Sequence, residues 1–119
     1  MQKIKTDPAF GGIDQYWRPD QSLQWGRVTL DGWVYGFWKD QLYSIMMWIN
    51  GWSEYEKLRK QVTTLFGPGS QNREGKECWV WIDPANQRML EFDRELGTGI
   101  LIMRSSSLDA LIKKRYPNP

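Results

Sequence analysis

Residues 53–67 constrain the fold most, because they describe one amphipathic helix with both a start and a stop. Ser53 is followed three residues later by Glu56, the pattern of a capping box in which each side chain satisfies a free backbone amide. Gly67 can adopt the conformation that ends a helix, and Pro68 prevents its continuation. The apolar residues follow the helical period on one side: Tyr55, Leu58, Val62, Leu65 and Phe66. A helix with one apolar side needs a surface to cover, and we expect the flanking segments to form it.

Runs of β-branched and aromatic residues on both sides of this helix predict an antiparallel sheet. We expect the strands at 25–30, 33–38, 42–49, 77–82, 88–92 and 99–104. Asp31-Gly32 is a strong signal for a two-residue hairpin turn, and Ser106 or Ser107 is expected to cap a short C-terminal helix. The predicted fold class is α+β: an antiparallel sheet of about five or six strands with one main helix (about 54–66) and a short C-terminal helix packed against it, in the order β-β-β-α-β-β-β-α.

The length of 119 residues fits one domain. Residues 1–24 show no clear period and contain several turn signals, so we interpret them as an irregular N-terminal arm and residues 25–119 as a single α+β domain. The apolar residues of this arm are expected to lie over the sheet: Phe10, Ile13, Tyr16 and Trp17.

Net charge and hydropathy give limited information about partners and location. A formal charge of +2 is too small to indicate a nucleic acid or an anionic membrane by bulk electrostatics. We find neither an apolar run long enough to span a membrane nor the pattern of a signal peptide. Location is therefore left open between two expectations for a soluble protein: the bacterial cell envelope if a signal peptide has been removed, and otherwise the cytoplasm.

The residues that usually carry catalysis are scarce in this chain. It has no histidine and one cysteine, Cys78, so the commonest general base, the usual zinc ligand and an internal disulfide are all excluded. Glu91, Asp93 and Glu95 are the carboxylates on which an enzyme hypothesis would rest, and we interpret them as a solvated loop end. We therefore predict no catalytic residues, no metal ligands and no cofactor.

Strand alternation predicts which side chains share a face of the sheet, because successive residues point to opposite sides. Assuming a five-residue loop at 83–87 that pairs Ile82 with Arg88, the face toward the helix would hold Tyr43, Ile45, Met47, Ile49, Cys78, Val80, Ile82, Leu90 and Phe92. The other face would hold Leu42, Ser44, Met46, Trp48, Glu77, Trp79, Trp81, Met89 and Glu91. A two-residue turn before Leu42 would add Trp33, Tyr35 and Phe37 to this second face, and a three-residue turn would add Val34 and Trp38 instead.

The most unusual feature of the composition is eight tryptophans, and the second face collects several of them beside carboxylates. We predict a non-catalytic binding or interaction module that uses this aromatic face, with a protein partner or a second copy as its ligand. Binding of a small ligand or carbohydrate is the alternative, an enzyme is third, and the acids on this face argue against nucleic acid. The hypothetical partner-binding residues are Trp33, Tyr35, Phe37, Ser44, Met46, Trp48, Glu77, Trp79, Trp81 and Glu91.

Several short segments resemble a family of small bacterial α+β domains of unknown function. These segments are the hairpin 36–45 with its sequence Phe-Trp-Lys-Asp-Gln-Leu, the helix end Phe66-Gly67-Pro68, the strand with Trp79 and Trp81, and the opening Phe10-Gly11-Gly12-Ile13. The resemblance covers about three-quarters of the chain and implies a location in the cell envelope. It implies no catalytic residues.

Overall fold

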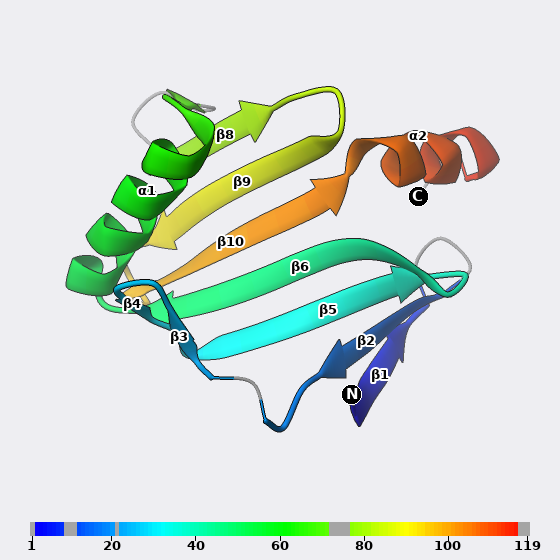
Figure 1. Ribbon diagram of the computed structural model, residues 1–119, viewed down its shortest axis with the longest axis horizontal. Helices are drawn as coiled ribbons and strands as arrows, with labels where there is room; N and C mark the ends of the chain where they lie inside the picture. The colour runs from blue at the N-terminus through cyan, green and yellow to red at the C-terminus, as the bar shows by residue number, and fades with distance from the viewer. Residues whose placement is uncertain (1, 9–11, 21, 72–76, 117–119) are drawn as a thin grey trace.

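The computed structural model describes residues 2–8, 12–20, 22–71 and 77–116, and these form one large antiparallel sheet with a helix on each face (Figure 1). From edge to edge the strands are β1 (Gln2–Asp7), β2 (Ile13–Trp17), β5 (Gly32–Trp38), β6 (Gln41–Asn50), β10 (Thr98–Ser105), β9 (Asn86–Asp93), β8 (Cys78–Ile82) and β7 (Ser70–Gln71). A separate two-stranded sheet holds β3 (Gln24–Trp25) and β4 (Val28–Thr29), and the helices are α1 (Trp52–Phe66) and α2 (Ser106–Arg115). The predicted α+β class is confirmed.

The sheet is wider than predicted, because the N-terminal segment joins it. Residues 2–7 and 13–17, which were expected to be irregular, pair with each other as β1 and β2, and β2 then pairs with β5. Ile13 and Tyr16 are therefore part of the sheet and do not lie over it, whereas Phe10 falls outside the described residues. The prediction failed here because Lys3, Lys5 and other polar residues suit an exposed edge strand, which has no apolar period to detect.

The first turn also differs from the prediction. The two-residue turn lies at Gly26-Arg27, where Trp25 pairs with Val28, and Gly26 adopts a φ of 61°. Asp31-Gly32, expected to be the hairpin turn, leads into β5, and the backbone N–H of Asp31 donates to the carbonyl of Trp48. β5 therefore takes its partners from β2 and β6 instead of from the preceding strand.

Helix α1 begins one residue before the predicted cap. Gly51 occupies the cap position with no side-chain hydrogen bond, so the capping box is not formed. The two acids of that motif bind elsewhere: Glu54 Oε2 accepts the backbone N–H of Thr29 at 2.9 Å, and Glu56 Oε1 accepts the indole N–H of Trp52 at 2.6 Å. The predicted end is confirmed, since α1 ends at Phe66 and Gly67 has a φ of 85°.

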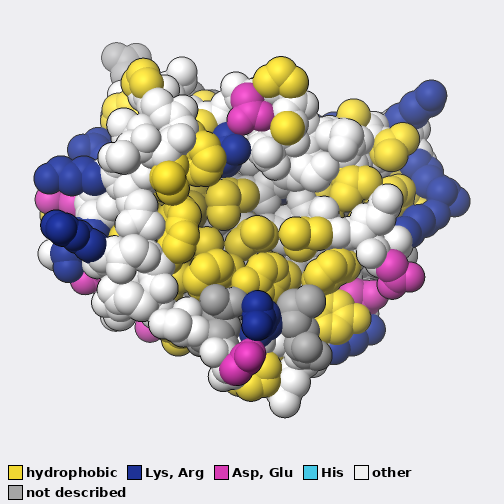
Figure 2. Space-filling view, in the orientation of Figure 1, with side chains coloured by type: hydrophobic (Ala, Val, Ile, Leu, Met, Phe, Trp, Pro, Cys, Tyr) yellow, Lys and Arg dark blue, Asp and Glu magenta, His cyan; other side chains and the backbone are white. Residues whose placement is uncertain are grey.

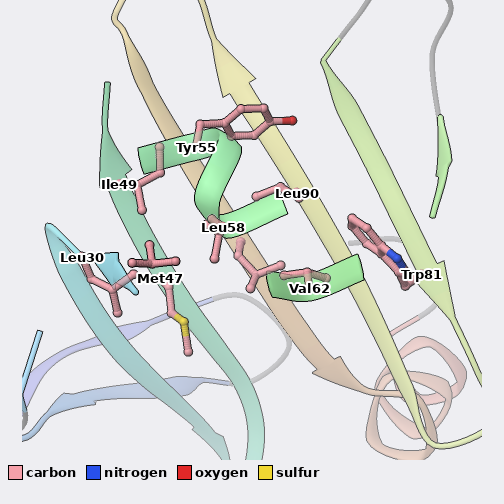
Figure 3. Packing of buried hydrophobic residues seen from close by; sticks show 10 residues of the cluster. Leu30, Met47, Ile49, Tyr55, Leu58, Val62, Trp81 and Leu90 are labelled. Atoms are coloured by element: carbon pink, nitrogen blue, oxygen red, sulfur yellow. The ribbon is translucent and has the colours of Figure 1, made fainter. Parts of the chain in front are cut away.

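The main core lies between α1 and the sheet. Tyr55, Leu58 and Val62 have no exposed surface, and Figure 3 shows them pointing from the helix toward residues of β6, β8 and β9. The sheet side of this cluster consists of Met47, Ile49, Trp81, Leu90 and Leu101, with Val28 and Leu30 at its margin. Leu65 and Phe66, predicted to belong to the same stripe, are exposed, although the Phe66 ring still lies against the guanidinium of Arg88.

Helix α2 covers one end of the opposite face. Leu108 and Ile112 pack with Ile13, Trp38 and Tyr43 in a second core cluster. Asp109 accepts a hydrogen bond from Gln87, whose neighbour Arg88 contacts Phe66 of α1. Because adjacent residues of a strand point to opposite faces, α1 and α2 lie on different sides of the sheet. Ser105 caps α2 by accepting the backbone N–H of Leu108, so the cap is neither Ser106 nor Ser107 as predicted.

Candidate binding surface

The structure divides the ten predicted binding residues between the two faces of the sheet. Six lie on the α1 face: Trp33, Tyr35, Phe37, Glu77, Trp79 and Trp81. Four lie on the opposite face: Ser44, Met46, Trp48 and Glu91. The single aromatic face that the sequence predicted therefore does not exist in that form.

A one-residue difference in the loop between β8 and β9 explains the error in β8. Ile82 pairs with Gln87 and not with Arg88, so Trp79 lies opposite Leu90 and Trp81 opposite Arg88. Both tryptophans thus share the face of the α1 core. Val80 and Ile82 point to the opposite face, where Ile82 is 75% exposed. A register shift of one residue exchanges the two faces of a strand, and four loop residues instead of five are enough to cause it.

A β-bulge explains the placement of β5. The turn has the two central residues Lys39 and Asp40, both with positive φ, but Gly36 pairs with Ser44 while Phe37 pairs with Leu42. Tyr43 is therefore an extra residue in β6, and it reverses the alternation from there on. As a result β5 follows the pattern expected for a three-residue turn: Val34 and Trp38 take the face opposite α1.

The α1 face of the central strands carries a continuous group of large uncharged side chains, which we call the aromatic surface: Tyr16, Trp33, Tyr35, Phe37, Leu42, Ile45 and Met103. The register places these residues opposite or next to one another. The rings of Tyr16 and Phe37 meet edge to face at 5.4 Å, and those of Trp33 and Tyr35 stack at 6.2 Å. Figure 2 shows hydrophobic side chains gathered over the middle of this face, beside α1. Leu42 is 47% exposed.

Sequence reasoning missed four members of this surface. Ile45 was assigned to the correct face but was expected to lie beneath a helix, whereas Leu42 was placed on the wrong side because the bulge was not foreseen. Tyr16 lay in the presumed arm, and Met103 lay in the last strand, which was not sorted by face. The alternation of Ile45, Met47 and Ile49 in β6 was the signal that could have extended the surface to β10, where Met103 is the register partner of Ile45.

The opposite face is aliphatic where α2 does not cover it. Val80, Met89 and Ile102 line a shallow hollow of about 160 Å³ across β8, β9 and β10. Of the four predicted binding residues on this face, Trp48 is the aromatic one, and its ring packs against Gly32. This face differs from the aromatic surface in having few groups that can form both apolar contacts and hydrogen bonds.

Several partly buried polar groups of the sheet are paired with one another. Glu77 Oε2 accepts the hydroxyl of Tyr55 at 2.7 Å and the indole N–H of Trp79 at 3.1 Å. Burial and the hydrogen bond to Glu77 both raise the pKa of Tyr55. The guanidinium of Arg88, almost fully buried, binds Asp83 at 2.9 Å and holds the pKa of that carboxyl below its usual value. These groups have partners within the fold.

A second polar group joins α2 to the sheet. The hydroxyl of Tyr43 donates to Asp109 at 2.8 Å, and Lys113 binds the same carboxylate at 2.9 Å. Burial and this hydrogen bond raise the pKa of Tyr43 to about 12. Burial alone would raise the pKa of Asp109, but the hydrogen bonds from Lys113 and Tyr43 outweigh it and lower the pKa.

Two of the groups that an enzyme hypothesis would use, Asp93 and Cys78, have places in the fold of their own. Asp93 Oδ1 accepts the backbone N–H groups of Glu95 and Leu96, which makes it a turn residue. Cys78 is buried, and the described residues contain no group of acids, histidines or cysteines that could hold a metal ion. Among the described helices, none has the length and hydrophobicity that crossing a membrane would require.

The fold and this surface define an α+β protein with an antiparallel sheet whose central strands are partly uncovered on the α1 side. Comparisons of the chain with protein families, with curated proteins and with solved structures find no match. The resemblance described from the sequence therefore rests only on the residues quoted for it.

Proposed function

We propose that this chain is a non-catalytic interaction module that pairs with a second copy of itself through the aromatic surface. One observation carries the proposal: seven contiguous uncharged side chains, four of them aromatic, lie side by side on the central strands. Trp33, Ile45 and Met103 border the α1 core, whereas Tyr16, Tyr35, Phe37 and Leu42 belong to neither core cluster. Tyrosine and tryptophan are enriched at the centres of protein interfaces, because each combines a large apolar area with a polar group.

The border of the aromatic surface supports the same function. Asp14 is the register partner of Phe37, and it binds Lys3 at 3.1 Å and the hydroxyl of Thr6 at 2.6 Å. A paired, solvent-exposed ion pair beside an apolar centre is the arrangement of an interface rim. Because no charged side chain belongs to the surface itself, two copies can meet there without burying an unpaired charge.

A standard protein interface takes about 800 Å² from each partner. A twofold dimer is the commonest assembly that uses one surface on both partners.

Sedimentation equilibrium over protein concentrations from about 1 µM to about 1 mM tests the proposal. We expect the wild-type chain to change from monomer to dimer within this range. Leu42→Asp, at an exposed position of the aromatic surface, should raise the dimer dissociation constant by about tenfold or more, because each copy then brings a charge into the contact. Ile82→Asp is the matched control, since it places the same charge at an exposed position of the opposite face.

Two results would contradict the proposal. The first is a wild-type chain that stays monomeric at every concentration. The second is a dimer that Ile82→Asp dissociates and Leu42→Asp leaves unchanged. Circular dichroism of each variant verifies that the fold is retained, and the exposure of both positions makes unfolding an unexpected outcome.

A further inference from the structure

A cleft of about 470 Å³ lies between α1 and the edge of the sheet formed by β7 and β8. Its lining includes Arg59, Lys60 and Thr63 from α1, Gly69 from the segment before β7, and Trp79 and Trp81 from β8. β8 and β7 form one edge of the sheet, and β9 separates them from the strands of the aromatic surface, which are β2, β5, β6 and β10. The cleft is therefore a separate site, and nothing in the proposed self-association requires it.

The two indoles present carbon surfaces to this cleft, because their N–H groups already have partners. Trp81 Nε1 donates to the carbonyl of Gly67 at 2.7 Å, and Trp79 Nε1 donates to Glu77. Gly69 lies directly against the ring of Trp81, where an added Cβ would approach the ring carbon Cε2 to 2.6 Å. Trp81 is only 5% exposed and forms a firm wall, whereas the ring of Trp79 is more accessible.

The charged groups of the cleft are all cationic. The guanidinium carbon of Arg59 lies 5.3 Å from the centre of the Trp79 ring, and Lys60 is the next residue on the helix. The described lining contains no carboxylate. Arg27 lines a neighbouring cleft together with Lys60, and Figure 2 shows Lys and Arg side chains gathered near α1. Neighbouring cations of one sign raise the local potential and concentrate anions.

We propose that this cleft binds a small organic anion that carries a ring. Its carboxylate pairs with Arg59 and Lys60, and its ring lies against Trp79. A carboxylate matches the planar guanidinium, which can donate two parallel hydrogen bonds to it. A ring is expected because Trp79 and Trp81 present indole carbon to the cleft. The volume is within the range of small-molecule pockets, about 300–1,000 Å³. Flat aromatic acids and sugar acids share this chemistry.

Titrations followed by two-dimensional ¹H–¹⁵N NMR test the proposal with three probes: benzoate, glucuronate and inorganic phosphate. The indole resonance of Trp79 is identified by its loss in Trp79→Phe. We expect saturable shifts of this resonance and of the Gly69 amide with benzoate, with glucuronate or with both, and the probe that binds tighter identifies the kind of ring. Inorganic phosphate, which has the charge without the ring, should bind about tenfold more weakly or not at all.

The variants separate a site from general charge attraction. Arg59→Gln should weaken binding of the ring-bearing anion by about tenfold, because it removes a charge-assisted hydrogen bond. Lys57→Gln removes one positive charge from the same helix outside this cleft, and it should leave binding nearly unchanged. Shifts that do not saturate with either organic anion, phosphate that binds as tightly as they do, or equal losses in the two variants would overturn the proposal.

Discussion

Tyr43 is the residue on which two parts of the structure depend. It is the extra residue of the bulge in β6, and this bulge decides which side chains of β5 join the aromatic surface. Its hydroxyl also donates to Asp109, which connects the sheet to α2. The same residue is therefore involved both in the assignment of β5 side chains to the two faces and in the attachment of the C-terminal helix.

The raised pKa of Tyr43 predicts a loss of stability at alkaline pH. Its pKa is about 12 in the folded chain and 10.0 in the reference state, so folding favours the protonated form. This contribution is complete below pH 10 and is lost as the pH rises through 12. Urea unfolding measured from pH 9 to pH 12 should show stability that decreases above about pH 10, and Tyr43→Phe should show a smaller decrease. Tyr55, whose pKa is also raised, contributes in the same direction.

Val62 tests the contact between α1 and the sheet. Val62→Asp should lower the free energy of unfolding by about 3 kcal/mol or more, because it buries an unpaired carboxylate. Thr63→Asp is the control, since the adjacent side chain is exposed. Urea unfolding followed by circular dichroism measures both variants. Equal stabilities for the two variants would contradict the assignment of Val62 to the core.

At the scale of secondary structure elements, the sequence predicted which elements form better than it predicted which face of the sheet each side chain takes. The periodicity of α1 and the alternation in β6 identified Leu58, Val62, Met47 and Ile49 as core residues, and the structure confirms them. The period of a strand has only two phases, so a single residue more or less in a loop exchanges its faces. The β8–β9 loop and the bulge at Tyr43 each introduced such a difference, and neither has a strong local signal.

The edge strand was missed for a different physical reason. β1 is exposed almost throughout, and its lysines match an unpaired sheet edge. A strand without a buried face has no apolar pattern that separates it from a loop. Three of the seven residues of the aromatic surface could nevertheless be predicted to share a face, because Trp33, Tyr35 and Phe37 alternate in one uninterrupted run. The predicted face was the one away from the helix.

Helix α2 provides a test at this scale. Ile112 has no exposed surface in the second core cluster, whereas its neighbour Leu111 is 53% exposed. Ile112→Ala should therefore lower the free energy of unfolding by about 2–4 kcal/mol, and Leu111→Ala should change it by less than about 0.5 kcal/mol. Thermal and urea unfolding of the two variants measure this difference. A large loss with Leu111→Ala would mean that the opposite side of α2 packs on the sheet.

At the scale of the whole molecule, two helices on opposite faces leave much of a wide sheet without a helix above it. α1 covers the strands near β9 and β10, and α2 covers one end of the other face. Each face therefore retains an apolar area, aromatic on the α1 side and aliphatic on the other. Our account assigns partner binding to the aromatic side, because tyrosine and tryptophan contribute most to interfaces.

Isotope-filtered NMR on a mixture of ¹³C-labelled and unlabelled chains tests this assignment most directly, because it records only contacts between copies. At a concentration where the chain is dimeric, we predict intermolecular contacts to the side chains of Tyr35, Phe37 and Leu42. Intermolecular contacts confined to Met89, Ile100 and Ile102 would contradict the account, since these residues lie on the opposite face.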